Sequence, residues 1–175
     1  IWNDRRLIEN IQSGEYTDSM RDLNSFEAVG ILRRDINHMD KYYIYEANNG
    51  NLNGTNDYVF LSSERMIRLM IEMDRDGDPE NPLCLETAYF DCSHSRVRGF
   101  KALGLWMMHP ATHRLMRLAN MYIRNENTEN IQKFFELVNR CCAEVLLDPS
   151  YKFNPDYFIC DEFAGNFATI RNVYG

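Results

Sequence analysis

Two aspartates, each preceded by a short apolar run, are the residues of this sequence best suited to chemistry. Asp91 follows Ala88-Tyr89-Phe90, and Asp161 follows Tyr157-Phe158-Ile159-Cys160. Two carboxylates that are forced together repel each other unless one is protonated or a cation lies between them. Oxygen ligands suit Mg²⁺, which retains waters that substrate phosphates can replace. The pair therefore predicts a site for cation-assisted phosphoryl transfer. The structural alternative is that Asp91 merely ends a strand while Asp161 caps the next helix.

The neighbours of these aspartates offer further candidates. His94 lies three positions after Asp91, where it could contact a phosphate or orient a water, although a structural histidine is equally expected. Cys92 and Cys160 flank the aspartates and raise the question of zinc. Alternation along a strand directs both thiols away from the face that the aspartates share. We therefore expect buried cysteines and no zinc site.

The elements that must position this site follow one another between residues 83 and 175. Hydrophobic periodicity and turn residues predict three strands, a helix, a fourth strand and a second helix, at 85–97, 100–108, 115–123, 127–146, 157–160 and 163–174. Short links make the three strands an antiparallel meander, and a helical crossover returns the fourth strand parallel to the first. The fold class is therefore α/β with a mixed sheet. In the helix predicted at 127–146, we expect that Cys141 and Cys142 cannot both face the core.

The preceding residues divide into two segments. Residues 55–82 are predicted to form a strand at 58–61, a helix with a methionine stripe and an acidic linker. Residues 1–54 are predicted to be a mostly helical leader of unknown role. The chain starts at Ile1 without a targeting signal, so we expect a cut rather than a natural terminus.

Composition narrows the function classes. The chain has 175 residues, of which 45% are hydrophobic, enough for one globular domain. No apolar run is long enough to span a membrane. Five cysteines without an export signal predict free thiols in a reducing compartment. The net charge is −7, yet residues 91–124 carry six basic side chains against one acid. Arg96, Arg98 and Lys101 are candidate phosphate contacts for DNA, and solvated strand faces are the alternative.

Residues 89–94, Tyr-Phe-Asp-Cys-Ser-His, resemble the first catalytic strand of Mutator-like element (MULE) transposase domains. The resemblance continues through 124–130, the Phe134-Phe135 helix and 158–162, and covers about residues 55–175. It implies an RNase H-like fold and a DDE-type enzyme that uses Mg²⁺ or Mn²⁺ to cut and join DNA. It also implies a nuclear location, and it is compatible with a full-length parent protein that forms a homo-oligomer.

By this resemblance, Asp91 and Asp161, which lie 70 positions apart, match the first and second catalytic acids of the family. The third, a glutamate on a later helix, has no counterpart before Gly175, and Glu162 does not replace it. We therefore expect an incomplete, RNase H-like catalytic domain in 83–175 that does not cut DNA by itself. The alternatives are a non-enzymatic DNA-binding or protein-interaction module of a nuclear regulator, or an unexpressed genomic relic.

Overall fold

The computed structural model describes residues 44–48, 57–73, 87–97, 100–109, 112–162 and 164–174. These residues form six strands and three helices. The strands are β1 (Ile44–Asn48), β2 (Tyr58–Leu61), β3 (Thr87–Val97), β4 (Phe100–His109), β5 (Arg114–Ile123) and β6 (Tyr157–Cys160). The helices are α3 (Glu64–Met73), α4 (Thr128–Leu146) and α5 (Ala164–Tyr174).

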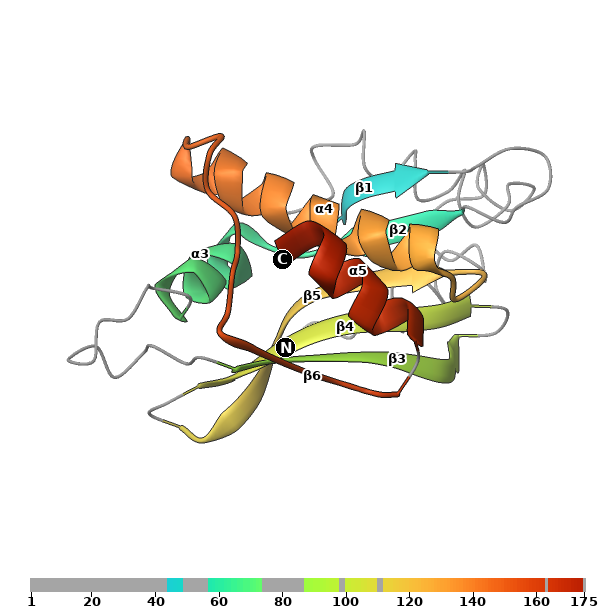
Figure 1. Cartoon of the computed structure of the whole chain (residues 1–175). Coiled ribbons are helices and arrows are strands. Elements are labelled where there is room, and N and C mark those ends of the chain that lie inside the picture. Colours follow the sequence, from blue (N-terminus) through green and yellow to red (C-terminus); the bar gives the residue numbers. More distant parts are fainter. Residues whose placement is uncertain are drawn as a thin grey trace.

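The strands form one mixed sheet in the order β1-β2-β5-β4-β3-β6. β3, β4 and β5 are an antiparallel meander, and β6 pairs with β3 in parallel. Figure 1 shows α4 and α5 together on one face of this sheet. The predicted α/β class, the order of the elements and the parallel return of the fourth strand are confirmed, with bounds close to those expected.

Two strands extend the sheet beyond the predicted meander. β2 pairs antiparallel with β5, with Phe60 opposite Met121, and β1 pairs antiparallel with β2. The strand at 58–61 was thus predicted correctly, and it joins the same sheet. Of the leader predicted as mostly helical, only Ile44–Asn48 are described. They form a strand, so the helical prediction is wrong there, while the acidic linker after Met73 lies outside the described residues.

Helix α4 has a defined start and end. Asn127 is its N-cap, and the Asn127 side chain accepts a hydrogen bond of 2.8 Å from the backbone N–H of Asn130. At the other end, Leu147 takes the left-handed conformation with φ 56°, which lets the N–H of Asp148 donate to the carbonyl of Ala143 at 3.0 Å. The sequence pattern predicted both limits.

Aromatic rings join the sheet to α4. Phe90 lies 5.5 Å from Phe134 and 4.9 Å from Phe135 between ring centroids, and Phe60 lies 5.7 Å from Phe134. Phe135 also meets Tyr174 of α5 at 5.6 Å, so both helices pack on the same side. Burying each phenyl ring contributes roughly 1.5–3 kcal/mol. This cluster fixes β3, and with it Asp91, relative to the helices.

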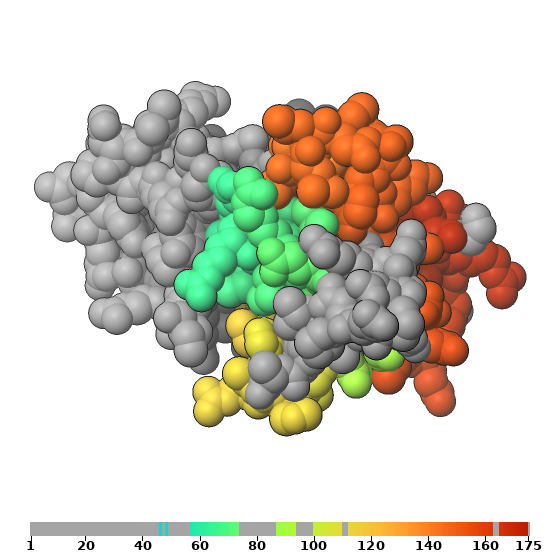
Figure 2. All heavy atoms as spheres, turned by 90° about the vertical axis from the view of Figure 1, so that its left-hand side faces the viewer, coloured from blue at the N-terminus to red at the C-terminus, as the bar shows by residue number. Residues whose placement is uncertain are grey.

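Helix α4 is covered on more than one side. It contacts α3 and α5 as well as the sheet, and Figure 2 shows α3, in green, between α4 above and β5 below. Cys141 and Cys142 are consequently both buried, at 2% and 0% exposure. The expectation that only one of them could face the core was wrong. The four described cysteines, Cys92, Cys141, Cys142 and Cys160, form no disulfide with one another. Among the described helices, none is long and apolar enough to cross a membrane.

Candidate metal centre

Asp91 and Asp161 occupy neighbouring positions on two parallel strands. The register pairs Tyr89 with Ile159 and Phe90 with Cys160, and each aspartate comes next in its chain. β6 ends at Cys160, whereas β3 continues to Val97. Asp91 therefore lies in the middle of β3, at the point where its β6 neighbour stops. The extra length of β3 comes from its hairpin with β4.

Asp91 lies on the face of the sheet that is turned away from α4. Its neighbours Phe90 and Cys92 are buried, with 1% and 4% exposure, while Asp91 itself is exposed. Side chains alternate between faces along a strand, so Cys92 points away from Asp91, as predicted. The hydroxyl oxygen of Ser93 lies 3.5 Å from Asp91 Oδ2, on the same face. The Asp91 carboxylate is thus accessible to solvent and ions.

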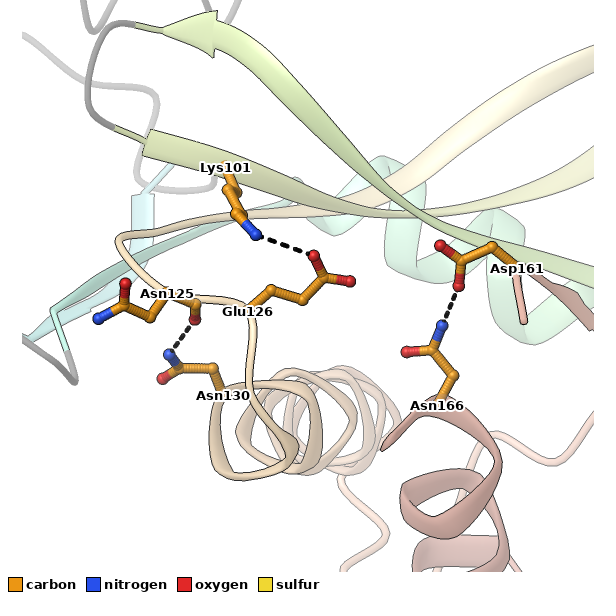
Figure 3. A network of polar contacts seen from close by, with 6 residues as sticks. All are labelled: Lys101, Asn125, Glu126, Asn130, Asp161 and Asn166. Atoms are coloured by element: carbon orange, nitrogen blue, oxygen red, sulfur yellow. Dashed lines mark hydrogen bonds and ion pairs between the residues drawn. The ribbon is translucent and has the colours of Figure 1, made fainter. Parts of the chain in front are cut away.

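Asp161 is held by a hydrogen bond from helix α5. It is exposed, and its Oδ1 accepts a hydrogen bond from Nδ2 of Asn166, in the first turn of α5. Figure 3 shows the two side chains pointing toward each other across the gap between strand and helix. This contact turns Oδ1 toward α5. Asp91 lies on the face turned away from α4, so the expectation that both carboxylates lie on one shared face is not met for this oxygen. Oδ2 is the oxygen of Asp161 that this hydrogen bond does not occupy.

Asn166 was not a candidate from sequence. It is 0% exposed, as is Thr169 one turn later, and both lie on the apolar face of α5 that Ile170 and Val173 continue. Asn166 Oδ1 and Thr169 Oγ1 have no hydrogen-bond partner among the described residues. Leaving such a group buried and unpaired costs roughly 1–3 kcal/mol. The signal in the sequence is a polar residue on an apolar helical face, five positions after Asp161.

The two thiols beside the site stay protonated at neutral pH. Burial, and after it the nearby Glu126 carboxylate, raise the pKa of Cys92 to about 12. The pKa of Cys160 is also raised, by burial and then by the charge of Asp161. Cys92 also points away from the Asp91 carboxylate, so the oxygen donors considered for a cation here are those of the aspartates.

Two basic side chains of the segment 91–124 form ion pairs within the protein. Lys101, a candidate DNA contact, lies with its Nζ 3.1 Å from Glu126 Oε2, and Figure 3 shows this pair between β4 and the start of α4. Arg124 pairs with the buried Asp57 at 2.9 Å. His94 and Arg96 belong to β3, but the structure does not describe their side chains, and Arg98 lies outside the described residues.

A line of larger side chains crosses the second face of the sheet beside Asp91. The registers place Ile159 opposite Tyr89, Tyr89 opposite Trp106, and Trp106 opposite Arg117. The Arg117 guanidinium lies 5.3 Å from the centroid of the indole ring. Ile159 at the edge is 52% exposed. We refer to these four residues as the cross-sheet line.

The donor set of the aspartate pair fits a hard divalent cation. Mg²⁺ is commonly held by one or two carboxylates, with water and phosphate oxygens completing its octahedron. Asp91 and Asp161 are the residues that would hold it. In the part of the chain that the structure describes, no group of three His, Cys, Asp or Glu side chains comes together around a possible ion.

No family model, curated protein or solved structure matches this chain. Its function is therefore inferred from its own residues and their geometry.

Proposed function

We propose that this chain is part of the catalytic domain of a DDE-type, MULE-like transposase with an RNase H-like fold. The observation that carries the proposal is the parallel register of β3 and β6, which brings Asp91 and Asp161 to adjacent positions. The meander, helix, parallel strand and second helix agree with the element order that the sequence resemblance implies. DNA would be the partner, in the nucleus, within a full-length parent.

In this proposal, Asp91 and Oδ2 of Asp161 hold Mg²⁺ or Mn²⁺ where β6 ends. The bound cation would supply charge stabilisation for the oxygens that attack and leave during phosphoryl transfer. In the parent, cleavage of a phosphodiester at an element end would free a 3′-hydroxyl for attack on target DNA. The exposure of both Asp91 and Asp161 supports this role.

Titration with Mn²⁺, followed by electron paramagnetic resonance, tests the proposal on the chain itself. Asp91→Asn and Asp161→Asn should each raise the Mn²⁺ dissociation constant at least about 10-fold, because each removes a charged ligand. Asp156→Asn is the matched control: Asp156 is exposed and lies just before β6, and its loss should change nothing. Equal affinity in the wild type and both ligand variants would contradict the proposal.

The cross-sheet line favours a second candidate, a nucleic-acid-binding module that does not cleave. Proteins bind single-stranded DNA by stacking its bases on aromatic side chains and by contacting its phosphates with basic ones. Trp106 and Arg117 are side chains of these two kinds. This candidate predicts oligonucleotide binding that persists in a chelator, weakens in Trp106→Leu, and is unchanged in Asp91→Asn. Binding that requires a divalent cation and Asp91 would favour the catalytic domain instead.

A further inference from the structure

Asn166 is a buried residue whose side chain donates a hydrogen bond to an exposed carboxylate. Its side chain is wholly buried in the first turn of α5, and its Nδ2 donates to Oδ1 of the exposed Asp161. Figure 3 shows the amide directed from the helix toward the end of β6. This hydrogen bond goes to a side chain within the helix, whereas a simple capping aspartate accepts from a backbone N–H at the helix start.

Stability does not explain an asparagine at this place. The Asn166 Oδ1 atom is buried without a hydrogen-bond partner among the described residues, and the residues that continue its helical face, Ile170 and Val173, are apolar. A leucine, of similar size, would fill the position without an unpaired acceptor. The contact that only a hydrogen-bond donor can make here is the one to Asp161.

We propose that Asn166 is a positioning residue for Asp161. By holding Oδ1, it fixes the rotation of the carboxylate, so that Oδ2 is presented to a cation at the β3–β6 edge. This inference rests on the proposed function, because it assigns Asn166 a role in the same site. Groups that hold a metal-binding side chain by a hydrogen bond typically change metal affinity by about 10-fold or more when removed.

Asn166→Leu and Thr169→Val, made separately in the full chain, form a matched pair. Each removes a wholly buried polar atom that lacks a partner, but only Asn166 touches Asp161. Both variants should unfold at a higher urea concentration than the wild type. Asn166→Leu should raise the Mn²⁺ dissociation constant about 10-fold, whereas Thr169→Val should leave it unchanged. If the role of Asn166 were purely structural, Asn166→Leu and Thr169→Val would change stability in the same way and would also change Mn²⁺ affinity in the same way.

The outcomes separate this inference from the proposed function. If wild-type Mn²⁺ binding depends on Asp161 but Asn166→Leu binds as tightly as the wild type, the positioning role is overturned and the proposed site stands. If the wild type shows no Mn²⁺ binding that depends on Asp161, both are overturned. Should Asn166→Leu fail to fold, Asn166→Ala serves as the second variant. The same 10-fold loss is expected in that variant, and an unchanged dissociation constant overturns the role.

Discussion

The indole ring of Trp106 lies against Gly104, so closely that a Cβ atom at position 104 would come within 2.6 Å of ring atoms Cζ2 and Cζ3. Gly104 is also the partner of Asp91 across the β3–β4 ladder. A glycine in a strand weakens it, and it is kept where another group approaches closely. The absence of a side chain at position 104 therefore allows the indole to lie beside the candidate site.

Gly104→Ala should destabilise the fold by about 1–3 kcal/mol, because the indole must leave its position to admit a methyl group. Urea unfolding gives the free energy, and near-ultraviolet circular dichroism reports the change around the indole. The control is the same substitution in a Trp106→Leu background, where most of the cost should disappear. An equal cost in both backgrounds would show that the contact with Trp106 is not its origin.

Leu147→Gly should stabilise the protein by about 1 kcal/mol, because a left-handed conformation costs an L-residue roughly that much. Leu147 has φ 56° and is 90% exposed, so little packing is lost with its side chain. The neighbouring Leu146→Gly is the control: Leu146 is the last residue of α4, and glycine in a helix should destabilise by up to about 1 kcal/mol. Chemical denaturation of both variants measures these two changes in unfolding free energy, which should have opposite signs. A destabilised Leu147→Gly would show that the left-handed conformation of Leu147 does not strain the protein.

The raised pKa of Cys92 predicts that the free energy of unfolding falls at alkaline pH. Its pKa is raised in the folded protein from the ordinary value of 9.0 to about 12. Below pH 9 the thiol is protonated in both states, so its contribution is fully present. Above pH 9 the unfolded chain releases the proton while the folded chain keeps it, and the free energy of unfolding falls by up to about 1.4 kcal/mol per pH unit.

The measurement is the difference in unfolding free energy between the wild type and Cys92→Ala. It should be constant between pH 7 and about 8, and shrink as the pH rises toward about 10, since the other titrating groups cancel in the difference. A difference that stays constant across this range would mean that the folded thiol titrates as it does in the unfolded chain.

The sequence predicted the elements whose pattern is local. In α4, the spacing of Ile131, Phe134, Phe135 and Val138 marks one apolar face, and all four side chains are buried. The apolar runs before Asp91 and Asp161 likewise predicted β3 and β6, and the meander with its helical crossover predicted their parallel pairing. Local periodicity and short connections therefore sufficed to predict that the two aspartates become neighbours along the strands.

Features that depend on packing between distant segments could not be predicted in this way. The pairing of β2 with β5 joins residues that lie far apart in the chain, and no local pattern selects that partner. The burial of both Cys141 and Cys142 depends on which neighbours cover α4. The contact between Asp161 and Asn166 likewise requires α5 to fold back beside the end of β6.

Iron-directed cleavage tests most directly whether Asp91 and Asp161 share one divalent cation. Fe²⁺ bound in place of Mg²⁺ generates hydroxyl radicals in the presence of ascorbate and peroxide, which cut the backbone close to the ion. If the two carboxylates share the ion, the chain should be cut near both residue 91 and residue 161. Excess Mg²⁺ should suppress both cuts together, and Asp91→Asn should abolish both. Cuts near only one of the aspartates, or cuts that Mg²⁺ does not suppress, would contradict a shared site.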